Sequence, residues 1–181
     1  MVIAIVVIVV IVAILAVLYN GLVSARNNVK NAWSQVDVQL QRRFDLIPNL
    51  VNTVKGYMKH EEEVLTKVAE LRTSWANAST VPEKANLDNQ LSGALKTIMA
   101  VSESNPDLKA SQNFTDLQNE LSNTESKISE ARQVYNNAVT NYNTKLEVIP
   151  TNFVAGICGF KSEELFKVES EEVRKNVKVE F

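Results

Sequence analysis

The stretch that decides the fold is FTDLQNELSNTESKISEARQVYNNAVTNY, residues 114–142. Within it, apolar or aromatic side chains recur at seven-residue steps, at Phe114, Leu121, Ile128, Tyr135 and Tyr142. A sustained seven-residue period is typical of long helices that pack side by side with a left-handed supercoil. The pattern predicts a helix over about 107–147, ended by Pro150, with coiled-coil-like packing against other helices.

Three helices are predicted before this one, and together the four make an antiparallel bundle of long helices over residues 20–150. Apolar side chains spaced three and four apart predict that the first continues through Phe44. They are Val29, Ala32, Trp33, Val36 and Leu40. A second helix is expected over about 48–77 and a third over about 81–102. Thr80, Pro82 and Glu83 have the pattern of a helix start, in which a hydroxyl caps the first turn and a carboxylate follows three residues later.

The junction FDLIPNL, residues 44–50, leaves two alternatives open. Pro48 disfavours helical geometry at Ile47 and lacks the N–H that a helix interior needs, so a boundary is expected here, with Asp45 as a cap. The apolar periodicity nevertheless continues from Leu40 to Trp75. The segment from Asp45 to Pro48 is therefore either a turn between two helices or a kink in a nearly continuous one.

The chain begins with an uninterrupted apolar run. From Val2 to Leu18 there is no charged, polar or glycine residue. A helix of this length spans about 26 Å, close to the ~30 Å hydrocarbon core of a bilayer, and Tyr19 follows where an interfacial aromatic residue is expected. We therefore expect residues 1–19 to be a transmembrane anchor. Because no helix breaker occurs between Val2 and Phe44, anchor and first bundle helix are expected to form one rigid helix.

A cleaved signal peptide is the competing interpretation of this run. Val23-Ser24-Ala25 fits the small-residue pattern that precedes a cleavage site. No basic residue precedes the run, however, and it is longer than the apolar region of a typical signal peptide, which favours an anchor. Arg26 and Lys30 lie just after the run, and this bias predicts a single-pass protein of the cell membrane with its N-terminus outside and its bundle in the cytoplasm.

The tail, residues 151–181, differs in character from the predicted bundle. Its large apolar side chains predict one or two short amphipathic helices that fold back on the bundle. They are Phe153, Val154, Ile157, Phe160, Leu165 and Phe166. Residues 169–181 are highly charged and are expected to be mobile.

Motifs and composition give no support to a catalytic, cofactor or metal site. His60 opens the sequence HEEEVL, but a zinc-protease helix needs a second histidine at the position of Val64. The acids 61–63 are consecutive in a helix and point in different directions. Cys158, the single cysteine, fits a small packed hydrophobe better than a nucleophile. No glycine-rich phosphate loop occurs, and a net charge of −2 gives no indication of nucleic acid or of a small-molecule substrate.

Charge is unevenly placed along the chain. Residues 1–60 hold six basic and two acidic residues, whereas the rest holds thirteen basic and nineteen acidic ones. Two charged residues, Arg43 and Glu61, fall in phase with the apolar face, and a charge that faces a bundle core is costly unless it is paired. Either Arg43 extends to solvent from a helix end, or it pairs with a carboxylate and fixes the helix register. Its candidate partners are Asp45, Glu120 and Glu125.

Asparagine is frequent for a helical chain, with nineteen residues. Those inside the predicted helices either bond to other helices or subunits or are simply exposed. They are Asn27, Asn28, Asn31, Asn136, Asn137, Asn141 and Asn143.

Two long stretches resemble the LemA family. They are YNGLVSARNNVKNAWSQVDVQLQRRFDLIPNLVNTVKGYMKHEEEVL, residues 19–65, and LKASQNFTDLQNELSNTESKISEARQVYNNAVTNYNTKLEVIP, residues 108–150. Residues 66–107 match only loosely. The resemblance implies a membrane-anchored antiparallel helical bundle of bacterial type, with no established catalytic residues, some of whose relatives take part in organising intracellular membranes.

The residues that carry this resemblance fall into two groups. One group stands at core spacing and is expected to be structural: Trp33, Leu40, Leu50, Val54, Phe114, Leu117 and Tyr135. The other forms the turn motif and is either a shared folding device or a partner surface: Arg42, Arg43, Asp45, Pro48 and Asn49.

These observations lead to a functional expectation. We expect a non-enzymatic, membrane-anchored scaffold or interaction protein that self-associates, with the lipid bilayer as its first partner. The alternative is an accessory or regulatory subunit of a membrane enzyme such as a protease, docked through the basic turn or the acidic distal face.

Overall fold

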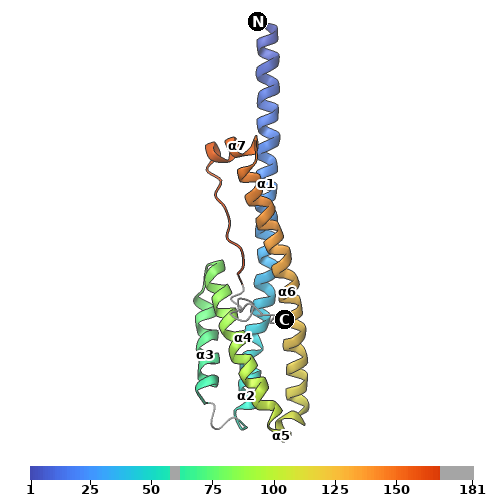
Figure 1. Cartoon of the computed structure of the whole chain (residues 1–181), viewed down its shortest axis with the longest axis vertical. Coiled ribbons are helices and arrows are strands. Elements are labelled where there is room, and N and C mark those ends of the chain that lie inside the picture. The colour runs from blue at the N-terminus through green and yellow to red at the C-terminus, as the bar shows by residue number, and fades with distance from the viewer. Residues whose placement is uncertain (58–61, 168–181) are drawn as a thin grey trace, which may run out of the picture. The chain divides into compact units, whose positions relative to one another are not determined.

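The structure is a computed structural model that describes residues 1–57 and 62–167. It is all-α: helices α1 to α7 follow one another, and no strand occurs in those two ranges (Figure 1). The predicted fold class, a long apolar N-terminal helix followed by helices that pack together, is thereby confirmed. Contacts divide the chain into two units, which are described separately. Unit 1 comprises Met1–Gln39 and Ser126–Leu165, and unit 2 comprises Leu40–Glu125 and the chain from Phe166.

Helix α1 is a single helix over Val2–Asp45, as the sequence predicts. Its first part has exposed apolar side chains throughout and extends beyond α7 with no neighbouring element (Figure 1). From Leu22 onward it is amphipathic, and its buried face follows the predicted spacing of three and four residues, at Leu22, Ala25, Val29, Ala32, Val36 and Leu40. The helix therefore changes environment along its length without a break in its backbone.

The junction at Asp45–Pro48 is a kink. Helix α2, Ile47–Val54, starts one residue after α1 ends, and the intervening Leu46 keeps helical angles of φ −77° and ψ −19°. Pro48 lies in the first turn of α2, where its missing N–H costs no helical hydrogen bond. The expectation that Asp45 caps the new helix is wrong, because its Oδ1 instead accepts a hydrogen bond of 2.9 Å from Gln41.

The predicted helix over 48–77 is two helices. The chain leaves α2 at Val54 and turns through Lys55–Tyr57, and α3 occupies Glu62–Asn77. Gly56 lies in this turn, and glycine is a poor helix former because it loses the most backbone entropy. Tyr57, which the periodicity placed on the apolar face, is 42% exposed.

Helix α4, Val81–Glu103, confirms the third predicted helix and its start signal. The Thr80 side chain accepts from the Glu83 N–H, and the Glu83 carboxylate accepts from the Thr80 N–H, so both halves of a capping box are formed. Hydrogen bonds from the backbone N–H groups of Ser79 and Thr80 to the Glu83 carboxylate lower the pKa of Glu83. Within unit 2, α3 packs against both α2 and α4.

The last long helix begins later than predicted. Asn105-Pro106 starts a separate one-turn helix, α5 (Pro106–Lys109), and α6 occupies Gln112–Glu147. The five side chains of the seven-residue repeat, from Phe114 to Tyr142, are all buried, as predicted. In unit 1, α6 runs antiparallel to α1: Leu146 contacts the cluster around Leu22, and Tyr135 packs edge-to-face on Trp33 at 5.4 Å between ring centroids.

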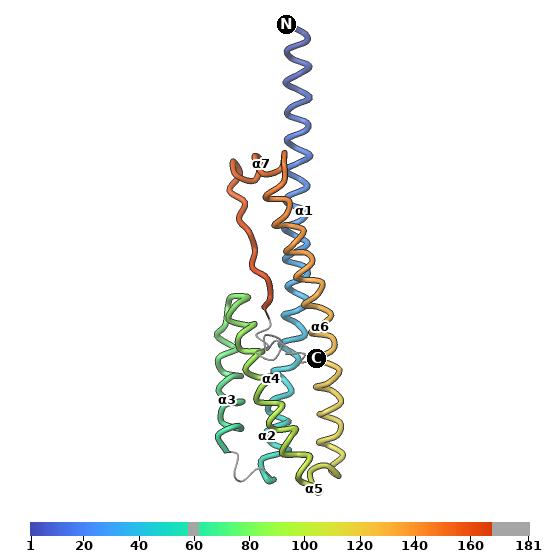
Figure 2. The backbone as a smooth tube through the Cα atoms, in the orientation of Figure 1, coloured from blue at the N-terminus to red at the C-terminus, as the bar shows by residue number. Residues whose placement is uncertain are grey.

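A short helix and an extended segment complete unit 1. Helix α7, Thr151–Cys158, ends at Gly159, whose φ of +70° is the left-handed conformation that glycine adopts without strain. The extended segment then runs back along α6 (Figure 2). Side chains of α6 hold it: Tyr142 and Tyr135 donate to the carbonyls of Lys161 and Glu164 at 3.0 and 2.8 Å, and Asn143 bonds to both backbone groups of Glu163.

Only part of the predicted tail packing is correct. Of the six predicted side chains, Val154 and Phe166 are buried and Phe160 is half-buried, but Phe153, Ile157 and Leu165 are 65%, 87% and 43% exposed. Side chains point outward on all sides of a helix, so α7 buries only the face that its neighbours in unit 1 cover. Residues 169–181, predicted to be mobile, lie outside the described residues.

Candidate functional site

Among the described residues, those with the clearest catalytic chemistry do not come together. In the two described ranges, no group of three or more His, Cys, Asp or Glu side chains is placed to hold a metal ion. His60 and Glu61 lie outside these ranges, and Glu62 and Glu63 are exposed at the start of α3. Cys158 is exposed at the end of α7, so its interpretation as a packed hydrophobe is wrong.

The Arg42-Arg43 motif is instead the centre of a charged cluster in unit 2. Arg43 is only 4% exposed. Its Nη1 donates to Asp88 Oδ1 at 2.7 Å, and its Nη2 lies 2.8 Å from Glu125 Oε2 as an ion pair, at an angle outside hydrogen-bond geometry. Arg43 therefore does not extend to solvent; it is the paired charge that the sequence offered as the alternative.

The electrostatics of this cluster follow from burial. Burial lowers the pKa of Arg43, because desolvation penalises the charged guanidinium, and the nearby Glu125 carboxylate acts in the opposite direction. The Asp88 side chain is fully buried, whereas the Glu125 side chain is 47% exposed. The innermost partner of Arg43 is thus a carboxylate whose charge water cannot stabilise, and each of these two groups requires the other.

The sequence found part of this cluster and missed the rest. Glu125 is a partner of Arg43, as predicted. Glu120 is bound by the exposed Arg42, whose Nε donates to it at 2.9 Å, and Asp45 is bound by Gln41. Asp88 was missed, although it stands three residues before Leu91, in phase with the apolar face of α4. A single acidic residue among the apolar positions of a predicted helix is the sequence feature that would have identified Asp88.

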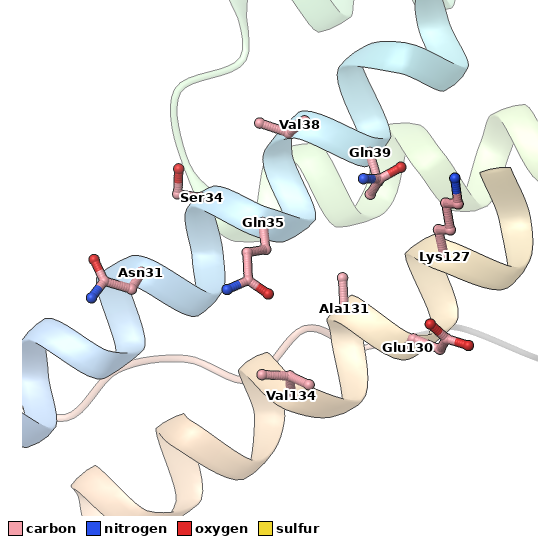
Figure 3. A pocket seen from close by; sticks show the side chains of 9 residues that line it. All are labelled: Asn31, Ser34, Gln35, Val38, Gln39, Lys127, Glu130, Ala131 and Val134. Atoms are coloured by element: carbon pink, nitrogen blue, oxygen red, sulfur yellow. The ribbon is translucent and has the colours of Figure 1, made fainter.

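An open groove of about 530 Å³ lies between α1 and α6 within unit 1 (Figure 3). Its α1 wall carries polar side chains and Val38, and its α6 wall carries Ala131 and Val134 with Lys127 and Glu130. Val38 and Val134 are 60% and 50% exposed. The Gln39 side-chain oxygen is buried there without a hydrogen-bond partner among the described residues. The groove thus combines exposed apolar side chains with an amide oxygen that can still accept a hydrogen bond. This composition is more typical of a surface that binds another protein than of a catalytic pocket.

A second groove of similar volume, about 510 Å³, lies within unit 2 between α4 and α6. Leu95, Met99 and Leu121 line it together with Lys96 and Glu103. One wall is completed by Arg43 and Glu125, so the charged cluster lies at its edge.

These features define a class: an all-α protein whose first helix is apolar enough to span a membrane and continues directly into packed helices, with surface grooves and a buried ion pair in its described part. The family model of the LemA family matches residues 32–181. The chain belongs to the LemA family.

Relatives extend this finding over most of the chain. Protein LemA of Metamycoplasma hominis is 29% identical over 161 residues, which cover 83% of this chain and 72% of that protein. Magnetosome protein MamQ 2 of Paramagnetospirillum magneticum and magnetosome protein MamQ of Magnetospirillum gryphiswaldense are 27% and 24% identical. The chain spans 64% of the length of these MamQ relatives.

Proposed function

We propose that this LemA-family protein is a non-enzymatic, membrane-anchored helical scaffold that self-associates in the plane of the bilayer. The observation that carries the proposal is the first part of α1, where apolar side chains from Val2 to Val17 are all exposed and no charge interrupts them. Such a surface is stable in hydrocarbon and costly in water, since each exposed methylene contributes about 0.8 kcal/mol on transfer. Among the described residues, α1 is the one helix long and apolar enough to cross a membrane. Kinship with magnetosome proteins supports a function at membranes.

The packing around Ala25 favours a retained anchor over a cleaved signal peptide. Leu22 is fully buried in a cluster with Val154 and Ala155, and Leu18 packs against it. Cleavage after Ala25 would remove both leucines and expose the face of α7 that they cover. Extraction of the full-length protein with alkaline carbonate tests the anchor: the protein is expected to stay with the membrane, and release into the supernatant would contradict it.

The orientation follows from the basic residues after the apolar run. Arg26 packs over the Phe160 ring at 5.4 Å, and Lys30 is exposed, so both charges lie just beyond the end of the span. We therefore assign the packed helices to the cytoplasm. Proteolysis of right-side-out and inverted vesicles tests this, and cleavage of the C-terminus in right-side-out vesicles would reverse the orientation.

The unit 1 groove supports self-association. Asn31, Ser34, Gln35 and Gln39 line it on α1, and amide groups both donate and accept, so two copies of the same face can satisfy each other in an isologous contact. Val38 and Val134 add apolar area to that face. Anchoring in a shared bilayer raises the effective concentration of copies and strengthens a contact that is weak in solution.

Disulfide crosslinking in native membranes tests this contact. In a Cys158→Ser background, Val38→Cys is expected to form a covalent dimer on mild oxidation. The matched control is Ser129→Cys, which is also exposed on unit 1 but does not line the groove. Equal crosslinking of the two variants would remove the groove as the contact, and a monomer after amine crosslinking of the wild type would remove self-association itself.

A second candidate function is an accessory subunit of a membrane enzyme, and the unit 2 groove favours it. Leu95, Met99 and Leu121 offer a mixed apolar surface of the kind that a partner helix covers. Affinity purification of the wild type and of Met99→Glu separates the candidates. Loss of a defined membrane protein from the Met99→Glu sample, with the dimer retained, would support the accessory function; identical partner sets would contradict it.

A further inference from the structure

One face of α7 carries exposed apolar side chains. Phe153 and Ile157 stand four residues apart in the helix and are 65% and 87% exposed, and Ile149, in the turn before the helix, is 76% exposed. Residues at this spacing lie one above the other on a single face of a helix. Their neighbour Val148 is 46% exposed, and α7 itself, TNFVAGIC, carries no charged side chain. The helix thus has two apolar faces, of which only the one with Val154 and Ala155 is covered.

Helix α7 packs beside the end of the apolar run of α1. Within unit 1, Val154 and Ala155 pack against Leu22, and Leu18 joins the same cluster. Leu18 is the last residue of the uninterrupted apolar run. Helix α7 therefore lies at the level where α1 leaves its apolar segment, and the N-terminal part of α1 extends beyond it (Figure 1).

The residues around this level have the composition of a membrane interface. Tyr19 is 44% exposed and packs edge-to-face on Phe160, with ring centroids 5.7 Å apart. Arg26 also lies over the Phe160 ring, with its Cζ 5.4 Å from the ring centroid. Lys145 and Lys161 flank α7 in sequence. Aromatic and basic side chains concentrate at the headgroup level of membrane proteins, where rings and charges are both accommodated.

We propose that α7 is a second membrane-contact element, an interfacial helix that inserts Phe153 and Ile157, together with Ile149 of the preceding turn, into the boundary between lipid headgroups and acyl chains. This inference rests on the proposed anchoring of α1. The exposed face of α7 adjoins the apolar segment of α1, so we assign the bilayer as what covers it. A bilayer that surrounds Val2–Leu18 reaches the exposed side chains of α7. A short uncharged helix with an exposed apolar face suits such an in-plane location. The covered face of α7, held on Leu22, then couples the bilayer surface to the α1–α6 pair.

The single cysteine permits a direct test with the full-length chain. Cys158 is exposed, so Cys158→Ser provides a cysteine-free background. Phe153→Cys and Ile157→Cys are labelled with an environment-sensitive fluorophore and reconstituted in vesicles of phosphatidylcholine and phosphatidylglycerol. Val10→Cys, in the apolar segment of α1, is the membrane control, and Ser129→Cys, exposed on α6 of unit 1, is the aqueous control. Circular dichroism verifies that each labelled protein is folded.

Quenching by lipids brominated on their acyl chains is the measurement. The labels at 153 and 157 are expected to be quenched, with blue-shifted emission, whereas the label at 129 is not. If the label at 10 is quenched and those at 153 and 157 are not, the inference on α7 fails while the anchor stands. If the label at 10 also escapes quenching, the anchoring proposal fails first. Labels at 153 and 157 that are blue-shifted but unquenched by brominated lipid would indicate a protein contact, such as a second copy, and would also overturn the inference.

Discussion

The two units differ in the polar side chains that they bury. In unit 2, a full charge is buried, and Arg43 is held by the carboxylates of Asp88 and Glu125. In unit 1, two neutral hydroxyls are buried: those of Tyr135 and Tyr142, which donate to backbone carbonyls of the extended segment. Both tyrosines are nearly fully buried, and both belong to the seven-residue repeat that packs the same helix.

The difference shows what each unit requires of its polar groups. A buried ion pair gains little net stability over an apolar core, but removal of one partner leaves an uncompensated charge. We therefore propose that the pair disfavours helix registers that separate Arg43 from Asp88. A buried phenol keeps most of its apolar contact area and needs only one hydrogen-bond partner. Loss of that partner therefore costs less free energy than loss of one member of a buried ion pair. Unit 2 is thus specified by charge and unit 1 by hydrogen bonds to the returning chain.

Removal of the Asp88 carboxylate is the change expected to have the largest effect. Asp88→Ala leaves the buried Arg43 guanidinium with Glu125 alone and is expected to lower the free energy of unfolding by about 3–5 kcal/mol. Chemical denaturation of the full-length protein in detergent, monitored by circular dichroism, measures it.

Two further variants make this test specific to the pair. Glu125→Gln, in which the lost carboxylate is half exposed, is the control and is expected to cost about 1 kcal/mol or less. Arg43→Leu combined with Asp88→Leu is expected to recover most of the loss, because it removes both charges. An Asp88→Ala protein as stable as the wild type would show that the pair does not specify unit 2.

A smaller effect is expected for the tyrosines of unit 1. Tyr135→Phe keeps the ring on Trp33 but leaves the Glu164 carbonyl without its donor, and we expect a loss of about 1–2 kcal/mol. Tyr57→Phe is the matched control, since that residue is exposed at the turn after α2, and its cost is expected to stay within about 0.5 kcal/mol. Hydrogen exchange should also increase at the backbone amides of 161–165, and unchanged exchange there would mean that the hydroxyl does not hold the segment.

The raised pKa of Tyr135 leads to a prediction for the stability of unit 1 at alkaline pH. Burial first, and then the carboxylates of Glu163 and Glu164, raise the pKa of Tyr135 from 10.0 to about 12. Because the folded pKa is above the unfolded one, the contribution of the protonated phenol is complete below pH about 10 and is lost as pH rises toward about 12. The stability difference between wild type and Tyr135→Phe is therefore expected to narrow over that range. A difference that stays constant from neutral pH to pH about 12 would contradict the assigned pKa.

Periodicity predicted the helices well where the apolar spacing was unbroken. The continuous α1, the capped start of α4 and the buried seven-residue repeat of α6 all follow from spacing and from a few start signals. The break at Lys55–Tyr57 was missed because the apolar phase continues past it, and a single Gly56 is a weak signal. The separate α5 was missed because four residues are too few to show a period.

The polar sites were harder to predict, since they depend on which helices meet. The sequence marked Arg43 as a charge in the wrong phase, but it did not find Asp88, which is 45 residues away and on another helix. It also assigned Phe153 and Ile157 to an amphipathic helix that folds back on the bundle, whereas both are exposed. Side chains of a short helix are buried only on the face that a neighbour covers, and spacing alone does not say which face that is.

The smallest loss of stability is expected on substitution of Arg42. Comparison of Arg42 with the adjacent Arg43 isolates the effect of burial. The two arginines are adjacent, and both bind a carboxylate, but the Arg42 side chain is 49% exposed and that of its partner Glu120 is 33% exposed. Water and ions screen such a pair, so Arg42→Ala is expected to cost about 0–1 kcal/mol, and added salt should abolish even that. Arg43→Ala removes the guanidinium whose charge balances the buried Asp88 carboxylate, so its larger cost should persist in high salt. Denaturation of both variants at low and high salt measures this difference, and equal costs with equal salt dependence would mean that burial does not distinguish the two arginines.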